Sequence, residues 1–164
     1  MKKSIFFLFT LIVIAAISCK KDTPVHPGDG LYPEKPIIEI LSVSPGTITA
    51  EICGQQDERV IELSTGQSLE LRFNIKARAG LSQYKIDIHS NFDCHSHRLG
   101  ESAATVPWKV LDIVALSGQE ITETQTLKVP ENATAGNYHF MMQALDNEGY
   151  EAEYILYTLK VKKH

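Results

Sequence analysis

The sequence has little that would support catalysis or nucleic-acid binding. Its 164 residues contain no Gly-x-Ser-x-Gly nucleophile elbow, no His-Glu-x-x-His zinc motif and no glycine-rich phosphate loop. No segment has the 3.6-residue apolar spacing of an amphipathic helix. The 20 acidic residues outnumber the 16 basic ones, so a basic face for nucleic acid is not expected. These absences favour a non-enzymatic, all-β protein that does not bind nucleic acid.

The amino terminus, MKKSIFFLFTLIVIAAISC, has the pattern of an export signal. Lys2 and Lys3 precede a nearly unbroken apolar run from Ile5 to Ile17, which is shorter than the ~20 residues of a membrane span. The ending Ala-Ile-Ser-Cys resembles the lipobox of bacterial lipoproteins. That resemblance implies cleavage before Cys19 and acylation of its thiol and amino group, which gives a stable lipid anchor. A retained membrane helix is the alternative.

The expected organisation has three parts. Residues 1–18 form the signal peptide, residues 19–36 form a lipidated, Pro/Gly-rich tether, and residues 37–164 form one domain with a single core. By the lipoprotein sorting pattern, Lys20 in place of aspartate favours the outer membrane. The domain is then expected to face the periplasm or the cell surface.

From residue 37 onward, apolar residues recur with a period of two. The segment SLELRFNIKA, residues 68–77, alternates apolar and polar side chains throughout its first eight positions. The segment SQYKIDIHS, residues 82–90, repeats this alternation. Such patterns are typical of half-buried antiparallel strands. About seven short strands separated by turn residues predict an antiparallel β-sandwich.

The closing segment, residues 129–161, resembles the last strands of immunoglobulin-like and fibronectin-like bacterial surface domains. Tyr138 takes the place of the tyrosine corner, and the sequence DNEG, ending at Gly149, takes the place of the last hairpin turn. With the lipobox and a His-rich segment, the chain from about residue 36 to 162 resembles a family of uncharacterised Gram-negative lipoproteins. Their single His-rich immunoglobulin-like domain has no known function. The resemblance therefore implies a fold and a location, and no activity.

The segment HSNFDCHSHR, residues 89–98, holds three of the six histidines. In the immunoglobulin-like order, the strand that ends near His89 is the antiparallel neighbour of the strand that begins near Tyr138. Alternation places His89 and His139 on the outward face at matching ends of these strands. Opposed side chains there have Cβ atoms about 5 Å apart, which allows two imidazoles to share a metal ion. A one-residue slip in register would turn a histidine into the core instead.

Further ligands follow the first of these strands. His95 and His97 lie two residues apart, and Asp93 supplies a carboxylate that could ligate or orient an imidazole. Imidazoles with one carboxylate favour zinc, copper or nickel, and Met141 adds a thioether that favours copper. The predicted metal ligands are His89, Asp93, His95, His97 and His139. The alternative is a solvated polar loop that is rich in histidine.

The two remaining cysteines form an even pair. Cys53 and Cys94 would both be exposed to an oxidising compartment, where disulfides persist. A bridge between them would close a long loop and contribute about 4 kcal/mol in the chain-entropy model. The alternative is that Cys94 is a metal ligand among the histidines.

Together these patterns predict a membrane-anchored, non-enzymatic binding or accessory domain. It would contact the membrane through its lipid, and an envelope protein or a glycan through its surface, with zinc or copper as the possible cofactor. One alternative is an adhesion or glycan-binding module that stacks sugars on Trp108, if that ring is exposed rather than packed in the core. Another is a small metal-dependent hydrolase that uses the His cluster with Asp93.

Overall fold

The computed structural model describes residues 34–92 and 106–164. Within these ranges the chain forms strands, turns and loops, and contains no helix that could cross a membrane. The expected signal peptide and most of the tether lie outside the described residues. So do three of the predicted metal ligands, namely Asp93, His95 and His97.

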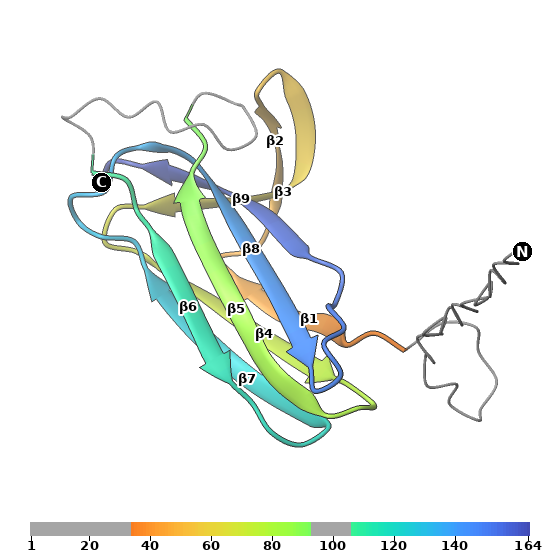
Figure 1. Ribbon diagram of the computed structural model, residues 1–164. Coiled ribbons are helices and arrows are strands. Elements are labelled where there is room, and N and C mark those ends of the chain that lie inside the picture. Colours follow the sequence, from red (N-terminus) through yellow and green to blue (C-terminus); the bar gives the residue numbers. More distant parts are fainter. Residues whose placement is uncertain (1–33, 93–105) are drawn as a thin grey trace, which may run out of the picture. The chain divides into compact units, whose positions relative to one another are not determined.

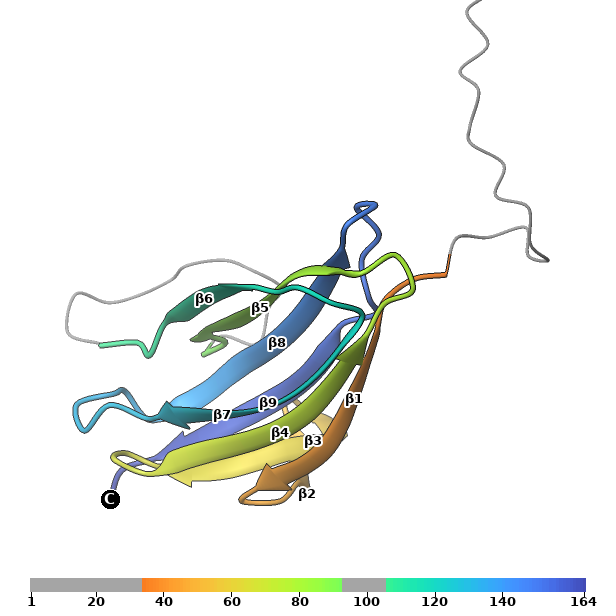
Figure 2. The same cartoon turned by 90° about the horizontal axis from the view of Figure 1, so that it is seen from below.

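The described strands form two sheets that pack face to face, as the view in Figure 2 makes plain. The three-stranded sheet has the order β1 (Ile37–Ser44), β4 (Ser68–Lys76) and β7 (Glu120–Lys128). The six-stranded sheet, the broad face in Figure 1, has the order β2 (Ile48–Ile52), β3 (Gln55–Ser64), β9 (Ile155–Lys162), β8 (Gly136–Asp146), β5 (Leu81–Ser90) and β6 (Val110–Ala115). The predicted β-sandwich is therefore confirmed.

The described part of the chain has nine strands, against about seven predicted. Strands β2 and β3 form a hairpin that turns at Cys53 and Gly54, both with positive φ. Strand β3 then runs parallel to β9, with Val60 opposite Thr158, whereas the other paired strands are antiparallel. This hairpin extends away from the sandwich body and brings β3 against the last strand (Figure 1).

The core lies between the sheets and contains the apolar positions that the alternation predicts. Strands β4 and β5 each bury four apolar side chains that are at most 1% exposed: Leu69, Leu71, Phe73, Ile75, Leu81, Tyr84, Ile86 and Ile88. Each large apolar side chain contributes about 1.5–3 kcal/mol on burial. Trp108 is also buried, at 4% exposed, and its ring packs edge-on against Tyr138 with centroids 6.1 Å apart. The alternative of a glycan-stacking platform required an exposed Trp108 ring, and the ring is packed in the core instead.

Two local features of the immunoglobulin-like resemblance are present. The Tyr138 hydroxyl donates a 2.7 Å hydrogen bond to the Thr134 carbonyl oxygen, which is the predicted tyrosine corner. Gly149 has φ of +87° in the β8–β9 turn, where the Asp146 carboxylate accepts backbone N–H bonds from Glu148 and Tyr150. The corner holds the start of β8 in place. It thereby directs the next residue, His139, outward from the sheet.

Candidate functional site

His89 and His139 face each other across neighbouring strands, as the alternation predicts. The register of β5 and β8 places the two residues directly opposite one another. Their ring centroids are 5.3 Å apart and the rings meet at 84°. Tyr138 and Phe140, on either side of His139, are fully buried in the core, which confirms that His139 points outward. Two histidines fifty positions apart in sequence thus meet on one face.

Asp87 joins this pair from the same strand as His89. The His89 Nδ1–H donates to Asp87 Oδ1 over 2.8 Å, and both side chains are about three-quarters shielded from solvent, at 24% and 31% exposed. A carboxylate at Nδ1 fixes the ring orientation and the tautomer, so that Nε2 carries the lone pair. Asp93, the carboxylate expected to ligate or to orient an imidazole, lies outside the described residues. The i, i+2 spacing of Asp87 and His89 on one strand face is the sequence signal for the contact of Asp87 with His89.

The pair alone does not complete a metal site. Among residues 34–92 and 106–164, no group of three or more His, Cys, Asp or Glu side chains is arranged to hold a metal ion. Two imidazoles are half of the four ligands that zinc commonly takes. The predicted ligands Asp93, His95 and His97 lie outside the described residues, so the full five-residue cluster stays a prediction.

A hollow of about 280 Å³ opens beside His139 on the outward side of β8. Strands β3, β8 and β9 line it, through residues that include Asp57, Arg59, His139, Met141, Leu156 and Thr158. Asp57 links two of these strands, because its Oδ2 accepts a 2.8 Å hydrogen bond from the Thr158 hydroxyl. Sequence reasoning missed Asp57 and Arg59, since the position of the β2–β3 hairpin could not be read from its residues.

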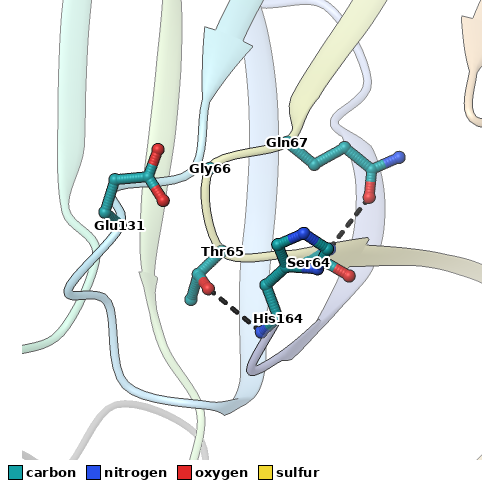
Figure 3. A pocket seen from close by; sticks show the side chains of 6 residues that line it. All are labelled: Ser64, Thr65, Gly66, Gln67, Glu131 and His164. Carbon is teal, nitrogen blue, oxygen red and sulfur yellow. Dashed lines mark hydrogen bonds between the residues drawn. The ribbon is translucent and has the colours of Figure 1, made fainter.

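A second hollow, of about 390 Å³, lies at the β3–β4 turn (Figure 3). Its lining residues are Ser64, Thr65, Gly66, Gln67, Glu131 and His164. The Thr65 hydroxyl accepts a hydrogen bond from the His164 backbone N–H, and Glu131 forms an ion pair with Lys128. Figure 3 shows Glu131 to the left of the turn and His164 to its right.

Cys53 is disulfide-bonded. It occupies the β2–β3 turn with φ of +56°, a conformation that non-glycine residues seldom adopt. The other two cysteines of the chain, Cys19 and Cys94, lie outside the described residues. The Cys53–Cys94 pairing therefore stays a prediction.

Comparison with known proteins gives a family without an assigned activity. A family model described as a domain of unknown function, DUF4625, matches residues 17–161. No curated protein matches the sequence.

Several solved structures are similar in fold. A Niemann-Pick type C2 protein from Japanese carpenter ant aligns with 82% of this chain and 98% of its own, at 8% identity and a TM-score of 0.46. The SrpA adhesin from Streptococcus sanguinis aligns over 79% and 58% of the two chains, at 14% identity and a TM-score of 0.43. An AA10 lytic polysaccharide monooxygenase from Streptomyces lividans aligns over 62% and 58%, at 16% identity and a TM-score of 0.41. These likenesses concern the β-sandwich alone.

Proposed function

The chain belongs to the DUF4625 family of domains of unknown function, and we propose that it is a non-enzymatic binding domain of the bacterial envelope that holds a transition metal. The observation that carries this proposal is the opposed pair His89 and His139, with ring centroids 5.3 Å apart. Neutral imidazoles at this spacing suit zinc or copper. Because both residues lie on paired strands, little conformational freedom is lost when a metal binds.

The surroundings of the pair support this role. Asp87 holds the His89 ring through Nδ1, so a metal ion would bind this ring at Nε2. Met141 lies directly opposite Asp87 in the β5–β8 register, two residues along the strands from the pair of His89 and His139. A thioether therefore lies on the same outward face as the two imidazoles. A thioether is a soft ligand and favours copper over zinc. Asp93, His95 and His97 follow β5 in the chain, and we assign to them the remaining ligand positions.

Calorimetry on metal-stripped protein tests the site. Zn²⁺ or Cu²⁺ should bind at micromolar concentration, and His139→Ala should abolish most of the binding heat. His164→Ala is the matched control, because His164 lies at the other hollow and contacts Thr65. No binding heat with either ion would overturn the proposal. So would an equal loss of binding in the control variant, since the two histidines could not then be distinguished.

The proposal also includes a location for the domain, at the outer membrane. The apolar leader and the Ala-Ile-Ser-Cys ending support lipidation at Cys19 and display on the outer membrane, facing the periplasm or the cell surface. The membrane is then one partner, through the lipid. For the second partner, an envelope protein is favoured over a glycan, because Trp108 is 4% exposed and offers no ring face for a sugar.

A further inference from the structure

The hollow beside His139 has an apolar floor. Met141 on β8 and Leu156 on β9 are directly opposite each other in register, and both line the hollow. Leu156 is 40% exposed although it is a large apolar side chain. Methionine is flexible and polarisable, so it adapts to ligands of irregular shape. The floor therefore suits the apolar body of a small molecule.

The hollow is lined by one acidic and one basic side chain, Asp57 and Arg59, and among the described residues only the acidic side chain has hydrogen-bond partners within the protein. Asp57 is held within the protein: its Oδ1 accepts the Arg59 backbone N–H and its Oδ2 accepts the Thr158 hydroxyl, each at 2.8 Å. This carboxylate fastens β3 to β9, and both of its oxygens already accept hydrogen bonds. Thr158 is 8% exposed, so this contact is shielded from water.

The Arg59 guanidinium is the charge that remains for a ligand. Across the described ranges, no carboxylate lies within ion-pair distance of it. Its field nevertheless reaches the hollow: burial raises the pKa of Tyr157, which also lines the hollow, and the Arg59 charge partly offsets that rise. Guanidinium groups bind carboxylates through paired, charge-assisted hydrogen bonds.

We propose that this hollow binds a small carboxylic acid with an apolar body, which pairs its carboxylate with Arg59 and packs its body on Met141 and Leu156. The volume of about 280 Å³ lies just below the usual range for ligand sites, roughly 300–1,000 Å³, which fits an acid with a single ring. The site needs no metal ion. Acid binding therefore does not depend on the metal site at His89 and His139, although His139 and Met141 lie beside both.

Methyl NMR of the full domain, with labelled methionine and EDTA present, tests this inference. Phenylacetate should shift the Met141 methyl signal in a saturable way. The signal of Met142, which is fully buried on the opposite face, should stay unchanged. Two matched probes dissect the ligand: benzyl alcohol has the ring without the carboxylate, and acetate has the carboxylate without the ring. Both should bind at least tenfold more weakly than phenylacetate.

Variants assign the contact to Arg59. Arg59→Gln should weaken phenylacetate binding by about tenfold or more, because a charge-assisted pair is lost. Arg72→Gln, on an exposed position of β4 in the other sheet, should bind as the wild type does. Equal binding of phenylacetate and benzyl alcohol, unchanged binding in Arg59→Gln, or no saturable shift at Met141 would each overturn the inference. Because EDTA removes metal ions from the sample, these outcomes test acid binding alone and do not depend on whether the metal site exists.

Discussion

The Tyr84 hydroxyl on β5 donates a 2.9 Å hydrogen bond to the Glu123 carboxylate on β7, so a polar contact joins the two sheets at the edge of the core. Gln125 Nε2 donates to the same hydroxyl oxygen at 2.5 Å. The Tyr84 side chain is fully buried, and its ring packs edge-on against Phe73 with centroids 5.3 Å apart. Burial first, and then the hydrogen bond to Glu123, raise the pKa of Tyr84 well above its usual range.

Removal of this hydroxyl should destabilise the sandwich. Tyr84→Phe keeps the ring and leaves Glu123 and Gln125 without their shared partner, so the free energy of unfolding should fall by about 1–3 kcal/mol. Urea denaturation measures this change. Tyr154→Phe, at a position 47% exposed, is the control and should change stability by less than about 0.5 kcal/mol. Equal stability of wild type and Tyr84→Phe would show that the contact between the sheets contributes nothing net.

The same hydroxyl should make stability depend on alkaline pH. In the unfolded chain the phenol loses its proton near pH 10, whereas in the folded domain Tyr84 keeps its proton to higher pH. The stabilising contribution is therefore fully present below about pH 10 and is lost as pH rises above it. Tyr84→Phe should reduce the steepness of this loss. The pKa of Tyr157 is also raised by burial, so some slope should remain in the variant. Identical slopes in urea titrations from pH 8 to 11 would contradict this origin of the effect.

The sequence predicts the positions of His89 and His139, but it does not predict the position of Arg59. His89 and His139 were placed correctly because each lies on a strand with strict alternation, and the two strands are neighbours in the immunoglobulin-like order. The position of Arg59 depends on parallel pairing between β3 and β9, which joins residues about a hundred positions apart. No local periodicity encodes that pairing.

Trp108 illustrates a different limit. Its place after Pro107 in a strand-like run was compatible with either a buried or an exposed ring. In the fold, its backbone N–H points to the Tyr138 hydroxyl at 3.4 Å and its ring enters the core cluster. The buried ring thus lies against the tyrosine corner of a strand that is distant in sequence. Alternation predicts which face a side chain takes, whereas only the tertiary fold decides what covers that face.

The cysteines give a redox prediction. In protein purified from the bacterial envelope, Cys53 and Cys94 should both resist labelling by a thiol reagent under denaturing, non-reducing conditions. Reduction should then expose two thiols and lower the free energy of unfolding, by up to about 4 kcal/mol in the chain-entropy model. Mass spectrometry of the labelled protein measures the number of free thiols. Labelling of Cys94 without prior reduction would remove the proposed pairing and restore that residue as a candidate ligand.

The anchor is tested through Cys19. Cys19→Ala should prevent lipidation and release the domain from the membrane fraction into the soluble fraction, because the acyl chains are lost. Detergent partitioning measures this, with Cys53→Ala as a control that keeps the lipidation position. Unchanged partitioning of Cys19→Ala would point to another mode of membrane attachment, such as a retained apolar leader.

Asp87 should strengthen metal binding by holding the His89 ring in place. Asp87→Asn keeps the side-chain volume but replaces the carboxylate that accepts the His89 Nδ1–H, so metal affinity should fall by about 10–100-fold. Asp112→Asn, on the neighbouring strand β6, should bind metal as the wild type does. Binding to the wild type should also weaken below about pH 6, since protonated imidazole cannot ligate. Calorimetric titrations at pH 7.5 and pH 5.5 measure both effects. Affinities that are equal at the two pH values would assign the bound metal to carboxylates elsewhere, and would leave His89 and His139 as an edge-to-face pair without a ligand role.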